Sequence, residues 1–170
     1  MRGKLALGGV FTLTCRSKKS GKVKWIEKTP NIVTNEGLDH ILNVHFHAAT
    51  QITTWYCALF NTNTTPLAAH TYAIPGYTES TDYDEATRQA YVEAEASSQS
   101  MTNSANRAVF TISDSTTIYG AALVSSSVKG DTAAAGAVLF ASGLFTNSKS
   151  VDDDDILELQ YTLTSADDGA

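Results

Sequence analysis

The segment PNIVTNEGLDHILNVHFHAATQITTWYCALF, residues 30–60, decides the fold of this chain. Its first half predicts a short helix over about residues 34–46, because apolar side chains recur there at helical spacing. These side chains are Leu38, Ile41, Leu42, His45 and Phe46. Thr34 is placed to cap the helix, and Glu36 lies in the first turn, where a carboxylate interacts favourably with the helix dipole. The β-branched and aromatic run at residues 53–60 predicts a strand that is covered on both faces, and we expect the helix to bury its apolar face there.

The rest of the chain alternates strands with turns, which is typical of an all-β domain. A first hairpin is expected to turn at Lys19-Ser20-Gly21, and long, irregularly spaced loops favour a jelly-roll-like β-sandwich of about eight strands. No repeat or linker divides the sequence, so residues 1–170 are expected to form one domain, with residues 1–29 as a basic N-terminal hairpin or arm. The expected strands lie at residues 5–16, 22–28, 53–60, 88–95, 107–113, 118–125, 137–145 and 155–164.

The composition limits the possible partners. The chain has 170 residues, of which 42% are hydrophobic and 18% charged, with a net charge of −6 and a pI of about 5.1. Because this charge opposes binding to phosphate backbones, no nucleic-acid partner is expected. No stretch approaches the roughly 18–20 apolar residues that span a bilayer, and the interrupted apolar run near the N-terminus makes a poor signal peptide. The sequence therefore predicts a soluble protein with no membrane partner.

The charges are unevenly distributed along the chain. Eight of the twelve Lys and Arg residues precede Pro30, whereas the last twenty residues carry seven acidic residues and no Lys or Arg. One interpretation is two solvated segments on opposite faces of the molecule. The other is a contact of the basic segment with an acidic partner, or of one copy with the next. The contact residues would then be Lys18, Lys19, Lys22, Lys24, Asp152, Asp153 and Asp154.

Residues 67–87 are the least regular part of the sequence, rich in Tyr and punctuated by Pro75-Gly76. A loop of this length inside a compact domain either has a function or is disordered. Tyrosine provides a large contact area at a low cost in conformational entropy. We therefore interpret the segment as an interaction loop with Tyr72, Tyr77 and Tyr83 as anchors at the rim of a contact. A passive connection is the alternative.

Possible metal ligands lie at unfavourable spacings. His40, His45 and His47 are separated by five and two residues, whereas a zinc site on a helix needs two His at positions i and i+4. The run 152–155 of four Asp has no interleaved Gly, which a calcium loop needs to wrap the ion. A solvated acidic turn is favoured over a divalent ion shared between subunits, so neither a metal nor a cofactor is expected.

Motifs of catalysis are also missing from the sequence. It contains no G-x-S-x-G, no phosphate-binding Gly-rich loop and no C-x-x-C. Carboxylates at residues 82–85 and 93–95 would form a glycosidase pair only at a suitable separation in space. Cys15 and Cys57 lie in apolar strand contexts, which predicts two buried free thiols, while a disulfide would need suitable geometry. We expect a protein that is not an enzyme.

Several runs resemble small virion proteins of tailed bacteriophages. Residues 31–42, NIVTNEGLDHIL, resemble the N-x-V-T-x-x-G-L helix start of such proteins, and residues 55–60, WYCALF, resemble the Trp-led strand that follows. Further similar features are RAVF at residues 107–110 and IYGAAL at residues 118–123. Members with G-D-x-L before the last strand differ from Asp154-Asp155-Ile156-Leu157 here, so that turn is altered.

This resemblance, which spans roughly residues 31–163, implies a capsid decoration (cement) protein with a jelly-roll-like sandwich. It implies a non-enzymatic virion protein that binds the capsid surface and stabilises contacts between capsomers, after synthesis in the cytoplasm of the bacterial host. The implied partners are the major capsid protein and the protein itself as a dimer or trimer. A tail, baseplate or fibre-associated component is one alternative. The other is a carbohydrate-binding module in which Trp25, Trp55 and the loop tyrosines stack on sugars.

Overall fold

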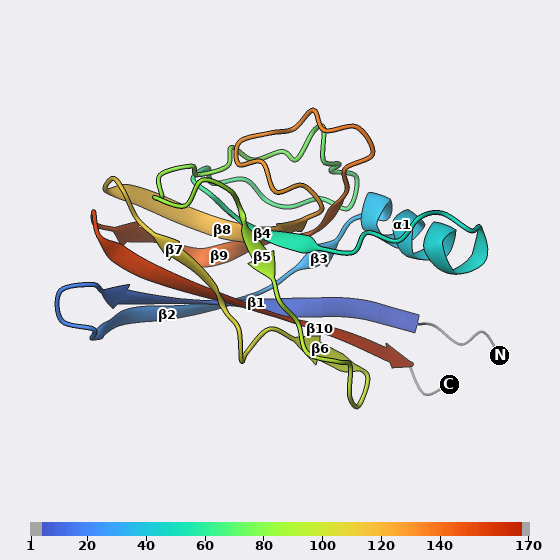
Figure 1. Ribbon diagram of the computed structural model, residues 1–170, viewed down its shortest axis with the longest axis horizontal. Helices are drawn as coiled ribbons and strands as arrows, with labels where there is room; N and C mark the ends of the chain where they lie inside the picture. The colour runs from blue at the N-terminus through green and yellow to red at the C-terminus, as the bar shows by residue number, and fades with distance from the viewer. Residues whose placement is uncertain (1–4, 168–170) are drawn as a thin grey trace.

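The computed structural model describes residues 5–167, which form two antiparallel sheets packed face to face (Figure 1). The strands are β1 (Leu5–Ser17), β2 (Val23–Pro30), β3 (Ile32–Val33), β4 (Trp55–Phe60), β5 (Gln89–Tyr91), β6 (Ser100–Thr102), β7 (Ala108–Thr111), β8 (Thr116–Val124), β9 (Leu139–Val151) and β10 (Asp155–Asp167), and the helix is α1 (Asn35–Phe46). Sheet A has the order β2-β1-β10-β6, with β7 also paired to β10, and sheet B has the order β3-β9-β8-β4-β5. The predicted all-β sandwich is confirmed, and its jelly-roll topology stays a prediction.

The described residues form ten strands, more than the eight expected. The additional strands β3 and β6 have only two and three residues, which is too short for an alternating pattern to reveal them. β5 is also shorter than expected, whereas β9 and β10 each extend over 13 residues. The sequence pattern thus predicted the long strands. It missed the two short strands, which are defined only by their hydrogen bonds to a neighbouring strand.

β1 lies between β2 and β10, so the first hairpin is part of the body of the sandwich. β1 pairs with β10 along its whole length, from Leu5 opposite Asp167 to Ser17 opposite Asp155. Gly21 has a φ of +66°, which lets the chain turn tightly between β1 and β2. The described part of the basic segment forms the β1–β2 hairpin. Residues 1–4 of that segment lie outside the described residues.

The main core fills the space between the two sheets. Side chains alternate along a strand, so β1 directs Phe11, Leu13 and Cys15 inward, where all three are fully buried. Cys57 of β4 is equally buried, and the two thiols are not joined, which confirms the prediction of buried free cysteines. Burial raises the pKa of Cys57 to about 12, so this thiol stays protonated at neutral pH.

Sheet B is apolar on both of its faces. On the face away from sheet A, a second cluster of buried side chains includes Ala58, Tyr72 and Val124. The loops at residues 61–88 and 125–138 cover this face and are visible above β8 and β9 in Figure 1. The prediction of a β4 strand that is covered on both sides is therefore confirmed.

Helix α1 projects from one end of the sandwich (Figure 1). Thr34 is its N-cap, as predicted: Thr34 Oγ1 accepts a hydrogen bond from Gly37 N at 3.0 Å and donates one to Leu139 O. Gly37 is the one buried residue of α1, and a Cβ there would lie 2.8 Å from Phe140 O. The helix is therefore held closely at its start, whereas the expected burial of its apolar face is incomplete. No helix among the described residues is long and apolar enough to span a membrane.

Candidate functional site

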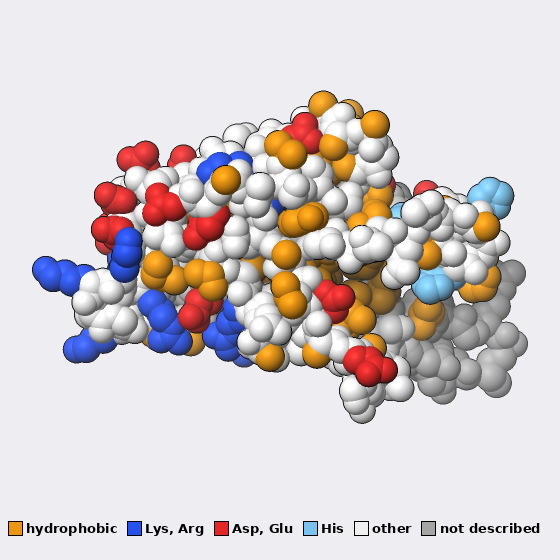
Figure 2. Space-filling view, in the orientation of Figure 1, with side chains coloured by type: hydrophobic (Ala, Val, Ile, Leu, Met, Phe, Trp, Pro, Cys, Tyr) orange, Lys and Arg blue, Asp and Glu red, His pale blue; other side chains and the backbone are white. Residues whose placement is uncertain are grey.

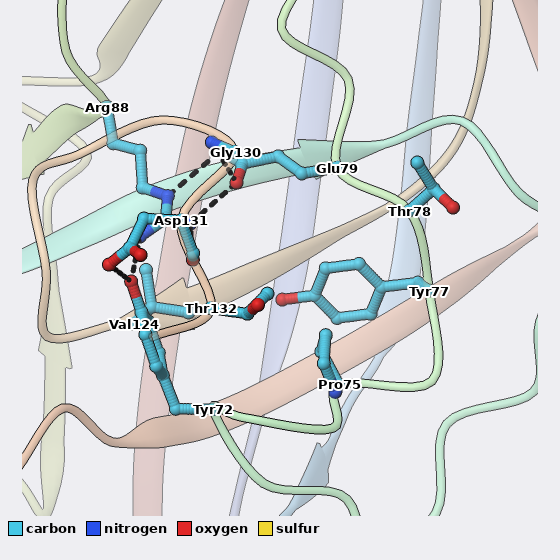
Figure 3. Close-up of a pocket in the computed structure, with 10 residues that line it drawn as sticks. All are labelled: Tyr72, Pro75, Tyr77, Thr78, Glu79, Arg88, Val124, Gly130, Asp131 and Thr132. Carbon is cyan, nitrogen blue, oxygen red and sulfur yellow. Dashed lines mark hydrogen bonds and ion pairs between the residues drawn. The ribbon is translucent and has the colours of Figure 1, made fainter. Parts of the chain in front are cut away.

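A cavity of about 280 Å³ opens between the two loops that cover sheet B (Figure 3). Its walls come from two segments that are far apart in the sequence, and its floor includes a side chain of β8. The lining residues are Tyr72, Pro75, Tyr77, Thr78, Glu79, Arg88, Val124, Gly130, Asp131 and Thr132. Ligand pockets are commonly concave sites with aromatic walls and a few charged groups. Whether this cavity can bind a ligand therefore depends on whether its polar groups are free or already hydrogen-bonded within the protein.

Arg88 uses all five of its N–H donors inside the protein. Its Nε and Nη2 donate to the two carboxylate oxygens of Glu79 at 2.9 and 2.6 Å. Nη1 donates to Tyr72 Oη and to Ser126 O, both at 2.9 Å, and Nη2 also donates to Asp131 O at 2.8 Å. The Arg88 and Glu79 side chains are only 3% and 7% exposed. Arg88 thus joins the two loops and is not available to bind an anion.

The carboxylates beside Arg88 are also engaged in hydrogen bonds. Glu79 Oε2 accepts a further hydrogen bond from Gly130 N at 2.8 Å. Asp131 accepts from the backbone of Ala133 and Ala134 and from Tyr72 Oη, and these hydrogen bonds lower the pKa of Asp131. An ionised, hydrogen-bonded carboxylate is a poor proton acceptor. The arrangement therefore fixes the loops more readily than it performs acid–base chemistry.

The loop tyrosines point into the protein, which corrects the prediction that they are rim anchors. Tyr72 and Tyr83 are only 4% and 2% exposed. Tyr77 is half-buried and stacks on Phe60 with 4.6 Å between ring centroids. The physical reason is that apolar surfaces lie within reach of these rings. Tyr72 and Tyr77 bury against the outer face of sheet B, and Tyr83 packs edge-on against Phe110 in the main core, with 5.0 Å between ring centroids. The sequence alone could not distinguish tyrosines buried in this way from tyrosines exposed for contact with a partner.

The predicted basic and acidic contact residues meet at one end of the same chain. Lys18 Nζ lies 2.5 Å from Asp154 Oδ1, and Lys24 Nζ lies 2.6 Å from both Asp152 Oδ2 and Asp155 Oδ2. The cause is the antiparallel pairing of β1 with β10, which places the end of one strand beside the start of the other. The interpretation as two segments on opposite faces is therefore wrong.

All seven predicted charged contact residues are exposed at this end, and three of them have no ion pair within the described residues. Lys19 and Lys22 lie at the tip of the β1–β2 hairpin, Asp153 lies in the acidic turn, and none of the three has an ion pair within residues 5–167. No group of three or more His, Cys, Asp or Glu side chains in the described part of the chain is arranged to hold a metal ion. The lysines of the predicted contact that are both exposed and unpaired within residues 5–167 are thus the two at the hairpin tip.

The opposite end of the molecule carries an apolar surface on and around α1. A groove of about 240 Å³ separates the helix from the sandwich, with Ile41 and Val44 on the helix side and Trp55 and Phe140 on the sandwich side. His40 packs edge-on against Trp55, with ring centroids 5.7 Å apart, so this His takes part in packing at the groove.

The outer side of α1 is a surface that sequence reasoning missed. Leu38, Leu42 and Phe46 are 40%, 55% and 83% exposed, although all three were expected to be buried. A signal was present in the sequence, because apolar residues occupy more of the helix circumference than one buried stripe requires. Large apolar side chains aligned on one side of an exposed helix are typical of interaction surfaces.

Comparison of the sequence with models of protein families and with curated proteins gives no match.

Proposed function

We propose that this protein is a non-enzymatic structural protein of a phage virion that binds the capsid exterior and stabilises contacts between capsomers. One observation carries the proposal: two exposed surfaces of different chemistry lie at opposite ends of one sandwich. The charged side chains gather at the hairpin end, while hydrophobic and His side chains appear at the helix end (Figure 2). A cement protein has to contact two neighbours at once, and separated surfaces on one folded body suit that task.

The chemistry of the hairpin tip supports the choice of partner. Lys19 and Lys22 are exposed and have no carboxylate partner within the described residues, so an acidic protein surface would pair with them. Each such contact is weak, because exposed ion pairs contribute about 0–1 kcal/mol. Repetition over a lattice turns many weak contacts into strong binding through avidity.

The resemblance of the helix and the Trp-led strand to virion proteins supports the same role. The alternative of a carbohydrate-binding module has less support, because its expected stacking platforms are partly used elsewhere. Trp25 and Trp55 pack against the main core, and Tyr72 is buried. A tail, baseplate or fibre-associated component would use the same two surfaces. Co-sedimentation with purified tails distinguishes that role from capsid decoration.

The test is co-sedimentation of the purified protein with phage shells that lack decoration, with purified tails and an insoluble polysaccharide as parallel samples. We expect saturable binding to shells at a fixed stoichiometry. Lys22→Glu is expected to weaken that binding roughly 5- to 10-fold, because it places a carboxylate against an acidic surface. Lys28→Glu is the matched control, since Lys28 is also exposed but lies on β2 away from the hairpin tip. Binding only to tails or only to the polysaccharide would overturn the proposal.

A further inference from the structure

The outward side of α1 carries three large apolar side chains in a row, which we name the apolar ridge: Leu38, Leu42 and Phe46. Their four-residue spacing aligns them along one ridge of the helix surface. Exposure rises from 40% at Leu38 to 83% at Phe46, because only the start of the helix is anchored to the sandwich. Gly37 and Ile41 face the sandwich instead, so the ridge is left exposed by the described part of the chain.

We infer that the apolar ridge forms an antiparallel contact between two copies of this chain. The ridge is symmetric about Leu42, with Leu38 four residues before it and Phe46 four residues after it. A two-fold axis near Leu42 would therefore bring Leu38 of each copy beside Phe46 of the other. The most protruding side chain then packs beside the most recessed one, which is the complementarity that ridge-into-groove packing of helices needs.

The charges at this end favour a second copy as the occupant. The protein has a net charge of −6, so two copies repel one another wherever their acidic side chains meet. In α1 the carboxylate of Glu36 is directed inward, where it accepts hydrogen bonds from Tyr72 N and Leu139 N at 2.8 and 2.6 Å. Asp39 is the one other acidic residue of the helix. A strongly charged partner would find few ion-pair partners on the helix itself, whereas an equally apolar helix surface meets little repulsion there.

The available area predicts a weak association. An aromatic side chain buries about 150–250 Å² when it is fully covered, so the three side chains of the ridge supply on the order of 300 Å² per copy. A standard interface buries about 800 Å² per partner, and smaller interfaces are typical of transient contacts. We therefore expect a dimer with a Kd on the order of 10–100 µM. This inference does not depend on the proposed binding to shells.

The first experiment is sedimentation velocity on the full chain from about 5 to 500 µM, a range that brackets the expected Kd. The weight-average sedimentation coefficient is expected to rise from the monomer value towards the dimer value. Leu42→Glu places two carboxylates near the two-fold axis and is expected to raise the Kd at least about 10-fold. Leu67→Glu is the matched control and should leave the Kd unchanged, since Leu67 is 54% exposed against 55% for Leu42 and lies outside the ridge.

A cross-linking experiment locates the axis. Cys15 and Cys57 are fully buried, so an engineered Leu42→Cys thiol is the accessible one in the described part of the chain. Helices that pack 8–10 Å apart bring the two Cα atoms at the axis within disulfide reach, so diamide is expected to yield a covalent dimer. Leu67→Cys should give no covalent dimer under the same conditions, because residue 67 lies outside the ridge.

Two outcomes would overturn the inference. One is a protein that stays monomeric at every concentration. The other is an association that Leu42→Glu leaves unchanged while circular dichroism shows that the variant is folded. A monomer that still co-sediments with shells at fixed stoichiometry would overturn the contact between copies and leave the proposed function standing.

Discussion

Two segments outside the strands are attached to sheet B, and they differ in how they are held. The loop at residues 61–88 is fixed along its length by the Arg88–Glu79 pair and by buried tyrosine rings. Helix α1 is held in its first half, by the Thr34 cap, by Glu36 and by the packing of Ile41 against the main core, and its last turn is exposed. The irregular loop is the better buried of the two segments. Regular secondary structure therefore does not indicate how firmly a segment is packed against the sheets.

The largest expected effect comes from removing the centre of the loop network. Arg88→Met leaves the Glu79 carboxylate buried without its partner, so we expect a loss of about 3–5 kcal/mol in the free energy of unfolding. Urea denaturation followed by circular dichroism measures this loss. Replacing both partners, Arg88→Met with Glu79→Leu, should recover part of it, since no uncompensated charge remains. A loss below about 1 kcal/mol for Arg88→Met would mean that the loop is not held by this pair.

The start of α1 is expected to be the next most sensitive position. Thr34→Ala removes the hydroxyl that caps Gly37 N and binds Leu139 O, which should cost about 1–2 kcal/mol. Thr34→Ser keeps that hydroxyl and serves as the control, with a smaller loss. Equal losses for the two variants would contradict the assignment of the effect to the cap.

A dependence on pH should appear in the loop at residues 125–138. Backbone hydrogen bonds hold the pKa of Asp131 below its usual value of about 3.9, so its contribution to stability is complete above that value. The contribution is lost as the pH falls through the lowered pKa of the folded state. The protection factors of the amides at residues 125–138, which compare each exchange rate with the intrinsic rate at the same pH, should therefore fall below about pH 4. Asp131→Asn should exchange faster at neutral pH and change less on acidification, and an unchanged profile would exclude this role of Asp131.

The smallest effect is expected at the free end of α1. Phe46→Ala removes a side chain that is 83% exposed, so the free energy of unfolding of the monomer should change by less than about 0.5 kcal/mol. Amide exchange measured at low protein concentration should be faster after Leu42 than in the first turn of the helix. Slow exchange throughout the helix would show that α1 is held more evenly than its contacts indicate.

The sequence predicted what periodicity and local chemistry determine. The all-β sandwich, the bounds of the helix and its Thr34 cap, and the buried Cys15 and Cys57 all follow from local patterns and are confirmed. The direction in which a side chain points was harder to predict. Tyr72 and Tyr77 have the apolar outer face of sheet B beneath them, and Tyr83 reaches the main core, which no local pattern reveals.

The contacts of the charged groups could not be predicted for a related reason. Arg88 and Glu79 are nine residues apart with no regular spacing, and Arg88 also binds Ser126 and Asp131 of another loop. The basic and acidic ends of the chain meet because β1 and β10 pair, which is a long-range event. Such contacts depend on the completed topology, so composition and spacing identified the residues without identifying their partners.

The pairing of β1 with β10 also has a consequence for how the chain acquires its fold. Leu5 pairs opposite Asp167, so the interior strand of sheet A gains one of its neighbours only after nearly all of the described residues have been synthesised. Native contacts between residues so distant in sequence give a high contact order, which slows folding. During synthesis β1 would wait with an unpaired edge, in a state prone to association with other nascent chains. The lysines of the hairpin, which discourage edge-to-edge pairing, would then protect the protein before it is folded.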